Sequence, residues 1–217
     1  MNVSQIKNKI AEYKEAGKKI FVTSSFQTHS IPLLHIISNI DNNIPILFIN
    51  TGFHFPETII FRDKVAELLQ LKLIDVKSMV SRNLQKDFKG RFYFASDPDY
   101  CCFINKTQPI EPFLAGYDIW INGVRSEQNA NRKAMQAEMP APKGCVRFHP
   151  ILDWTSKMIY EYIREYNLPK HPLENQGYVS IGCEPCTRKI DLNDERAGRW
   201  FGLNKTECGL HTDLVNK

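Results

Sequence analysis

Short apolar runs alternate with helical segments along the first half of the chain, and this alternation narrows the possible folds most. Four runs have the length and aliphatic composition of buried strands, at residues 19–25, 45–50, 71–76 and 118–122. Helical segments are predicted between them, notably at 30–39 and at 56–69, where a proline and an early glutamate mark a helix start. We therefore expect an α/β fold with a doubly wound, mostly parallel sheet covered by helices on both faces.

The composition is that of an ordinary globular domain. The chain has 217 residues, of which 42% are hydrophobic and 24% charged, and no linker or repeat marks a boundary, so we expect one domain over residues 1–217. Its apolar runs are far shorter than the roughly 20 residues that cross a bilayer. The amphipathic N-terminus carries Glu12 and Glu15, unlike a signal core or a transit peptide. We expect a cytoplasmic chain with no membrane segment.

The charge pattern indicates what kind of ligand to expect. The formal net charge is +4, and the Lys and Arg residues are dispersed rather than gathered in a basic block. A block of that kind is typical of nucleic-acid tails. We therefore expect a compact anionic ligand and no nucleic-acid partner.

Four of the six cysteines form two pairs. Cys101 and Cys102 are adjacent, and Cys183 and Cys186 form a CxxC motif in IGCEPCTR. In a cytoplasmic chain such cysteines indicate metal or redox chemistry before disulfides. Adjacent cysteine side chains diverge, which favours an iron–sulfur cluster, whose irons lie apart, over one zinc ion that demands convergence. Zinc stays open, as does a third interpretation in which all four thiols are buried and inert.

The other two cysteines read differently. Cys208 lies near the C-terminus in KTECGLH, close to Lys205 and His211, groups that can lower the pKa of a thiol. It is therefore a candidate nucleophile, with an ordinary surface cysteine as the alternative. Cys145 has apolar neighbours typical of a buried strand position, and we assign it no chemistry.

Polar residues follow the predicted strands at the sheet edge where such folds bind ligands. The turn SSFQTHS, which begins with Ser24, Ser25 and Phe26, joins a strand to a helix and offers hydroxyls and free amides to an anion. Helix capping is the alternative role of its serines. Thr51 and Gly52 follow the next strand, beside the first turn.

Arginines form two further groups. Arg125 and Arg132 follow the fourth predicted strand in GVRSEQNANR, and Arg196 and Arg199 lie in ERAGRW. Guanidinium groups suit phosphate and sulfate oxygens. One arginine alone is usually a solvated surface charge, but these groups, close to a candidate nucleophile, favour an anionic nucleotide.

Together these motifs resemble the assimilatory APS and PAPS reductases, or sulfonucleotide reductases. The similarity covers nearly the whole chain after the first helix and rests on TGFHFPET, on CC with Lys106 four residues after its second cysteine, and on GVRSEQNANR, HPILDWT, GYVSIGCEPCTR and GRWFGLNKTECGLH. It implies an adenine nucleotide alpha-hydrolase-like, PP-loop-like fold with a flexible C-terminal segment. Residues 195–217 would then be a mobile catalytic tail.

The resemblance also implies a reaction. Cys208 would attack the sulfate sulfur of adenosine 5'-phosphosulfate (APS), displace AMP and leave an S-sulfocysteine. Thioredoxin or a similar dithiol would then release sulfite, a step of sulfate assimilation for cysteine biosynthesis. The two cysteine pairs would hold a 4Fe-4S cluster that, with Lys106, positions and polarises the substrate.

Substrate contacts follow from the same resemblance. The serine turn, the Thr-Gly turn, the arginine loop and the C-terminal segment would form the pocket. His211 would act beside Cys208 and Lys106. The substrate-binding residues would be Ser24, Ser25, Phe26, Thr51, Gly52, Arg125, Arg132, Arg196 and Arg199.

Alternatives remain within and outside this family. Both cysteine pairs usually mark members that accept APS, so APS is favoured over PAPS or dual specificity. An ATP pyrophosphatase of the same broad fold is less favoured because its SGGxDS loop is missing. A non-enzymatic metal or redox sensor is the other alternative, and we also expect a homo-oligomer.

Four positions depart from the family pattern. Asn50 replaces the aspartate usual before Thr-Gly, and Asn105 stands where arginine often precedes the lysine. Ser126 replaces a common second arginine, and Asn129 a common serine. These departures bear on how ribose and phosphate are recognised.

Overall fold

The computed structural model describes residues 1–189, 196, 198–200, 202, 205, 207 and 209–211, with only the backbone of His211. A sheet in the order β3-β2-β1-β4-β6-β5 forms its centre. Its strands are β1 (Ile20–Thr23), β2 (Ile46–Asn50), β3 (Leu73–Lys77), β4 (Ile119–Asn122), β5 (Glu138–Pro140) and β6 (Val146–Phe148). Neighbouring strands run parallel except β5, which is antiparallel to β6.

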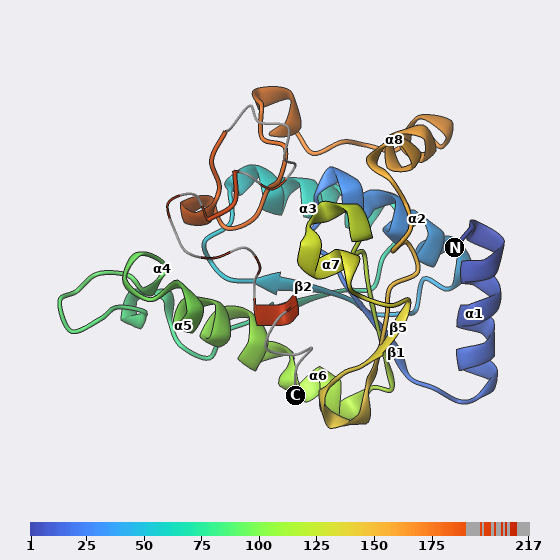
Figure 1. Cartoon of the computed structure of the whole chain (residues 1–217), viewed down its shortest axis with the longest axis horizontal. Coiled ribbons are helices and arrows are strands. Elements are labelled where there is room, and N and C mark those ends of the chain that lie inside the picture. Colours follow the sequence, from blue (N-terminus) through green and yellow to red (C-terminus); the bar gives the residue numbers. More distant parts are fainter. Residues whose placement is uncertain are drawn as a thin grey trace.

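Helices cover both faces of this sheet (Figure 1). The longer ones are α1 (Val3–Glu15), α2 (Ile31–Ile40), α3 (Pro56–Leu68), α6 (Gln108–Gly116) and α8 (Ser156–Glu165). The short helices are α4 (Tyr93–Ser96), α5 (Pro98–Cys102) and α7 (Ala130–Lys133). Helices α4 and α5 lie in the part of the molecule that projects to the left in Figure 1.

Alternate strand residues build two cores, because successive side chains of a strand point to opposite faces. Val22, Phe48 and Ile121 pack with apolar residues of α1, α2, α3 and α8. On the other face, Phe21 and Trp120 pack with α6 residues. Both faces are therefore buried, as a parallel sheet requires.

The sequence analysis predicted most of these elements. The α/β fold, the four strands β1 to β4 and the helices α1, α2 and α3 are confirmed. β5 was missed, and β6 was expected only as a buried strand position around Cys145, which is buried directly before it. In α8, Ile159 and Ile163 are buried and Met158 is exposed. Thr155 caps α8 by accepting a hydrogen bond from the Met158 amide.

The strand order of this sheet positions a ligand site. After β3, at one edge, the chain crosses to β4 on the other side of β1, so the strand order reverses there and a crevice forms at the carboxyl ends of β1, β2 and β4. Across the described part of the chain, no helix has the length and apolar character needed to span a membrane. Most of the tail predicted at 195–217 falls outside the described residues.

Candidate active site

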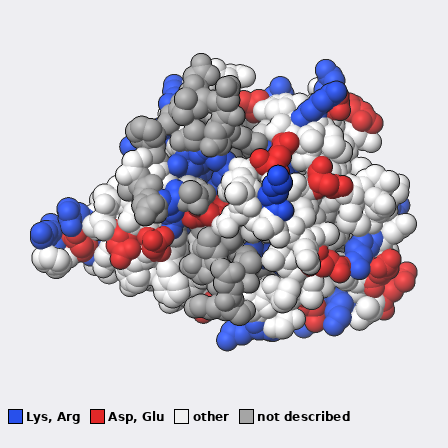
Figure 2. All heavy atoms as spheres, viewed as in Figure 1, with Lys and Arg blue, Asp and Glu red and all other residues white. Residues whose placement is uncertain are grey.

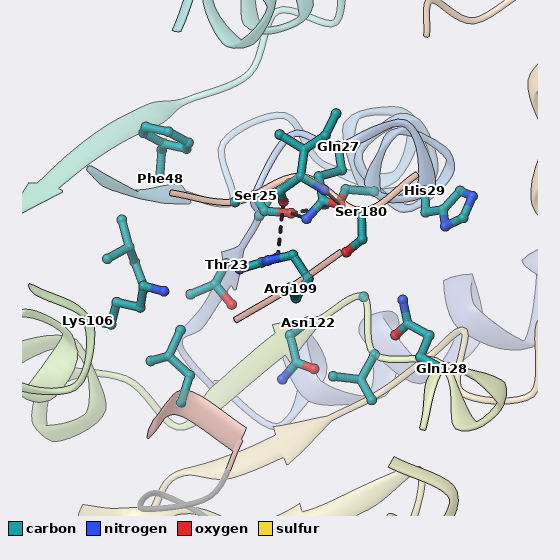
Figure 3. Close-up of a pocket in the computed structure, with 18 of the residues that line it drawn as sticks. Thr23, Ser25, Gln27, His29, Phe48, Lys106, Asn122, Gln128, Ser180 and Arg199 are labelled. Carbon is teal, nitrogen blue, oxygen red and sulfur yellow. Dashed lines mark hydrogen bonds between the residues drawn. The ribbon is translucent and has the colours of Figure 1, made fainter. Parts of the chain in front are cut away.

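A cavity of about 180 Å³ opens at the carboxyl ends of β1, β2 and β4 (Figure 3). Ser24 and Ser25, in the turn after β1, line it. The Ser24 hydroxyl accepts a hydrogen bond from the Phe26 amide at 3.1 Å, and Ser25 Oγ lies 3.3 Å from Ser30 Oγ. These serines thus shape the turn and also face the cavity, which suits the anion-binding role, but neither caps the following helix α2, whose N-cap residue is Ser30.

Four cationic side chains line the same cavity. Lys106, Arg132, Arg196 and Arg199 come from three separate parts of the chain. Figure 2 shows Lys and Arg atoms gathered in the middle of this face, between the main body and the projection that holds α4. A concave wall of one charge sign attracts a compact anion.

Backbone pairing sets the place of Arg199. Thr187 and Arg199 form an antiparallel bridge, and the Arg188 amide donates to the Gly198 carbonyl at 2.8 Å. A Cβ at Gly198 would lie 2.4 Å from the Arg188 carbonyl oxygen, and one at Gly182 would lie 2.2 Å from Arg199 Nη2. Gly198 is therefore needed for this close approach of two backbone segments, whereas a side chain at Gly182 would displace the end of the flexible Arg199 side chain. The guanidinium also donates to the Ile181 carbonyl at 3.3 Å.

The two cysteine pairs meet in a second, smaller hollow. Cys101 and Cys102 end α5, Cys183 and Cys186 flank a short turn, and all four line this hollow. The first three are buried and Cys186 is half-buried. The CxxC turn is fixed to the Thr-Gly turn, because the Glu184 amide donates to the Phe53 carbonyl at 2.7 Å.

Burial sets the acidity of these thiols. It raises the pKa of Cys101 to about 12, and the neighbouring Cys102 and Cys183 raise it further. Burial also raises the pKa of Cys186, again with a contribution from Cys183. A nearby cation would therefore favour the thiolate forms of Cys101 and Cys186 by offsetting their charge. In the part of the chain that the structure describes, no three His, Cys, Asp or Glu side chains converge closely enough to hold a single metal ion.

Polar side chains contact two of the sulfurs. Thr51 Oγ1 lies 3.2 Å from the Cys183 sulfur. Asn105, which departs from the family pattern, is buried, and its amide lies 3.6 Å from the Cys101 sulfur and donates to Gln85. Thr51 was predicted to bind substrate, but the structure places it on the wall of the cysteine hollow.

Lys106 lies on the wall of both spaces. It belongs to a π-helical turn, Phe103–Thr107, inserted between α5 and α6. Pro109 follows and has no amide hydrogen to bond the Asn105 carbonyl, which explains why the α-helical pattern is interrupted here. The extra residue of the turn brings Lys106 close to both the cysteines and the cavity.

Three predicted substrate residues lie elsewhere. The Phe26 side chain is fully buried in the core, edge to face with Phe48. Arg125 is also fully buried, pairs with Glu127 and donates to His29 Nδ1 at 2.9 Å. Gly52 lines neither space, and its carbonyl accepts from Arg82. These residues shape the loops around the cavity rather than its wall, and their role in substrate binding stays a prediction.

The structure adds residues that the sequence analysis missed. His54 lines the cavity, and its burial lowers its pKa to about 4, so it is neutral near pH 7. Asn122 ends β4 at the cavity, and neither polar atom of its buried amide has a hydrogen-bond partner among the described residues. Glu207 is a buried carboxylate between Arg132 and Arg196. Of these, His54 and Glu207 stood in recognised motifs, TGFHFPET and GRWFGLNKTECGLH, and so offered a signal.

The other departures from the family pattern have local roles. Asn50 donates to Asp75 at 2.9 Å and accepts from the Gly52 amide. Asn129 caps α7 by accepting from the Arg132 amide at 2.9 Å, and the Ser126 amide donates to Leu152. Cys208 lies outside the described residues, as does the side chain of His211.

Comparison with known proteins identifies relatives of the whole arrangement. Residues 19–189 match the phosphoadenosine phosphosulfate reductase domain. The chain is 40% identical to a phosphoadenosine 5'-phosphosulfate reductase of Gloeobacter violaceus, over 90% of this chain and 83% of that protein. It is 38% identical to an adenosine 5'-phosphosulfate reductase of Lysinibacillus sphaericus, over 92% of this chain and 87% of that protein.

Solved structures share the fold. A phosphoadenylyl-sulfate reductase of Candida auris superposes with a TM-score of 0.67 at 23% identity, covering 84% of this chain and 94% of that one. An FMN adenylyltransferase of Candida glabrata gives 0.58 at 15% identity, covering 81% and 60%. The fold is thus the PP-loop-like one expected. From its sequence matches, the chain belongs to the phosphoadenosine phosphosulfate reductase family.

Proposed function

We propose that this chain reduces adenosine 5'-phosphosulfate to sulfite and AMP, with thioredoxin or a similar dithiol as reductant. The observation that carries the proposal is a cavity lined by Lys106, Arg132, Arg196 and Arg199 that shares a wall with four cysteines, in a member of this reductase family. Relatives named for APS and for PAPS both match the chain. The two cysteine pairs favour APS.

The cationic wall suits the substrate's charge. A phosphosulfate carries anionic oxygens on both phosphorus and sulfur, so an approaching thiolate is repelled. Lys106 and the cavity arginines offset this charge and stabilise the negative charge that develops on the leaving phosphate. His54 is neutral and adds no charge of its own near pH 7.

Cys208 is the proposed nucleophile. Its thiolate forms a bond to the sulfate sulfur, the bond from that sulfur to the bridging oxygen breaks, and AMP leaves with the electron pair. A thiolate of the dithiol then attacks the Cys208 sulfur, and sulfite leaves with the electron pair of the broken sulfur–sulfur bond. The second thiol of the dithiol frees Cys208, so the dithiol is oxidised by two electrons and the sulfate sulfur is reduced to sulfite.

We further propose that Cys101, Cys102, Cys183 and Cys186 hold a 4Fe-4S cluster. Their number, shared hollow and burial support this, because the positive charge of the irons would offset four thiolates that burial disfavours. When bound, the cluster would act with Lys106 to position and polarise the substrate. Each thiolate would bind a different iron, so the set need not converge as it would on one metal ion.

A product assay tests the function. Protein purified without oxygen is given APS or PAPS with thioredoxin, and sulfite is measured. We expect sulfite from APS, none from the Cys208→Ser variant, and wild-type turnover from the matched control Cys145→Ser. Cys145 is buried beside β6 and lines neither space.

Other outcomes select the alternatives. Sulfite release by Cys208→Ser would refute the proposed nucleophile. Faster turnover of PAPS would reverse the substrate assignment, and pyrophosphate release from ATP would indicate an ATP pyrophosphatase instead. A cytoplasmic location and a homo-oligomer remain predictions, which cell fractionation and light scattering check.

A further inference from the structure

Glu207 is the residue directly before Cys208, and its carboxylate is fully buried. Arg132 holds it with two groups, Nε at 3.0 Å from one carboxylate oxygen and Nη2 at 2.8 Å from the other. Arg196 Nη2 donates to the same carboxylate at 2.7 Å. Such a forked contact fixes both the place and the orientation of a carboxylate.

Each partner of this ion pair compensates for the burial of the other. A buried carboxylate is costly unless cations and hydrogen bonds satisfy it, and removing one partner of such a pair is strongly unfavourable. Arg132 is 7% exposed, so water offers its guanidinium little compensation if the carboxylate is lost. The two arginines also hold the pKa of Glu207 below its usual range despite burial. The contact is therefore ionic and persistent near neutral pH.

A second contact lies on the other side of Cys208. Arg147, on β6, is fully buried and stacks over Trp120 with its guanidinium carbon 4.0 Å from the ring centroid. Its Nη2 donates to the Leu210 carbonyl at 2.7 Å. The chain is thus attached to α7 through Glu207 and to β6 through Leu210. Because Leu210 lines the cavity, these attachments lie at the cavity rather than on a distant surface.

The arginines that hold Glu207 are not reserved for it. Arg132 and Arg196 both line the cavity that we propose for the phosphosulfate. The Glu207 carboxylate therefore draws on the same guanidinium groups as the anionic oxygens of the substrate. If the carboxylate were lost, more of the positive charge of these arginines would be uncompensated and would attract the anionic substrate.

We infer that Glu207 is a positioning residue that fixes the segment carrying Cys208 at the cavity and shares Arg132 and Arg196 with the substrate. The inference rests on the proposed function for its kinetic part only. This role predicts opposite effects of a Glu207 substitution on kcat and on KM. Loss of the carboxylate misplaces the nucleophile, which lowers kcat, but strengthens the attraction of the arginines for an anionic substrate, which leaves KM unchanged or lower.

The test compares Glu207→Gln with Glu161→Gln in the anaerobically purified holoenzyme. Glu161 is an exposed residue of α8 whose carboxylate lies 3.9 Å from Lys157, so it provides the same chemical change away from the cavity. Steady-state rates with APS give kcat and KM. A second measurement is the rate at which iodoacetamide alkylates Cys208, followed by mass spectrometry of the C-terminal peptide.

We expect Glu207→Gln to lower kcat by about 10- to 100-fold, the cost of a small misplacement of a reacting group. KM for APS should not rise, and Cys208 should be alkylated several-fold faster because its segment is less firmly held. Glu161→Gln should match the wild type in all three quantities. Glu207→Asp keeps the charge but is one methylene shorter, so it should fall between Glu207→Gln and the wild type.

Two results would overturn the inference. One is a wild-type alkylation rate together with a wild-type kcat in Glu207→Gln. The other is a raised KM with an unchanged kcat, which would mean that Glu207 only orients the arginines for the substrate. If Glu207→Gln does not fold, as circular dichroism would reveal, Glu207→Asp decides between the same outcomes. If the wild type releases no sulfite from APS, the proposed function fails while the alkylation rates still decide the positioning role.

Discussion

The large cavity and the cysteine hollow adjoin, yet they are built in opposite ways. The cavity lies among loops that follow parallel strands, and four cationic side chains stand among the polar and apolar residues of its wall. The hollow lies between the end of α5 and the CxxC turn, and thiols and apolar side chains line it. Lys106 and Cys183 are on the walls of both.

The two spaces have complementary electrostatic needs. A cationic cavity is completed by an anion, whereas a cluster of thiolates is completed by a cation. Lys106 lies where both needs meet, because its charge partly offsets the rise in pKa that burial causes at Cys101 and Cys186 and also faces the cavity. Changes on the cysteine side should therefore affect catalysis, whereas changes on the cavity side should leave the cysteines intact.

The largest expected effect comes from the cysteine side. Cys183→Ser should reduce bound iron to background and abolish sulfite release, because it removes one proposed ligand from the wall common to both spaces. Cys145→Ser is the matched control, since it also removes a buried thiol. Iron and sulfide analysis with a visible spectrum measures the difference. Equal iron in the two variants would contradict the proposed site.

Lys106→Met should distinguish the function of the cavity from iron binding in the cysteine hollow. It keeps much of the side-chain length but removes the charge, so turnover of APS should fall by about 100- to 1,000-fold, as when one charge-stabilising donor is lost. Bound iron should stay at the wild-type level, because lysine is not a proposed ligand. Parallel iron and sulfite assays check both. A variant that lost iron and turnover together would show that Lys106 belongs to the cysteine side.

Two arginines from the predicted substrate set should behave differently, because only one lines the cavity. Arg199→Ala should raise KM for APS by about 10- to 100-fold, the loss of one charge-assisted contact. Arg125→Ala should instead lower the free energy of unfolding by about 1–3 kcal/mol, because His29 loses a buried hydrogen-bond donor, whereas water can replace the partner of the exposed Glu127. Kinetics and urea unfolding distinguish them. If Arg125→Ala had wild-type stability and a raised KM, Arg125 would instead be a substrate-binding residue.

Arg125 also illustrates what the sequence could predict. Strands β1 to β4 are buried apolar runs, and the rule that ligands bind at their carboxyl ends placed Ser24, Ser25 and Arg132 at the cavity correctly. The same rule cannot say which way a side chain of the following loop points. Arg125 and Arg132 both lie in the connection that follows β4. The 3₁₀ turn between them leaves the Arg125 side chain buried, where it pairs with Glu127.

The parts that could not be predicted depend on distant contacts. β5 and β6 have three residues each, too short to show an alternating pattern. Glu207 reads as an ordinary surface acid until Arg132, from the loop after β4, is placed beside it. The meeting of the two cysteine pairs was expected only from their ligand number, whereas their common hollow depends on the pairing of the CxxC turn with the Thr-Gly turn.

The smallest expected effect concerns how the cysteine side is held. His171 begins the segment that leads to the CxxC turn, and its Nε2 lies 3.0 Å from Thr58 Oγ1 of α3. Burial lowers its pKa to about 4. The unfolded chain, with a histidine pKa of about 6.5, then binds more protons than the folded chain below that pH, so stability is present above it and falls as the pH decreases towards 4.

When the pH falls from 7.5 to 5.5, the free energy of unfolding should decrease by about 1.4 kcal/mol because of His171, which corresponds to one pKa unit. Over this range the unfolded chain protonates the histidine and the folded chain keeps it neutral. His171→Gln removes this titration, so its unfolding free energy should fall less over the same range. Urea unfolding of both proteins at the two pH values measures the difference.

His149, with a pKa also lowered to about 4 by burial, lies beside β6 and away from the cysteines, so His149→Gln is the matched control. Both variants should flatten the pH dependence equally, but only His171→Gln should make the CxxC thiols easier to alkylate, because only His171 holds the segment that carries them. Equal alkylation in the two variants would mean that the cysteine side is held by its backbone pairing with the Thr-Gly turn alone.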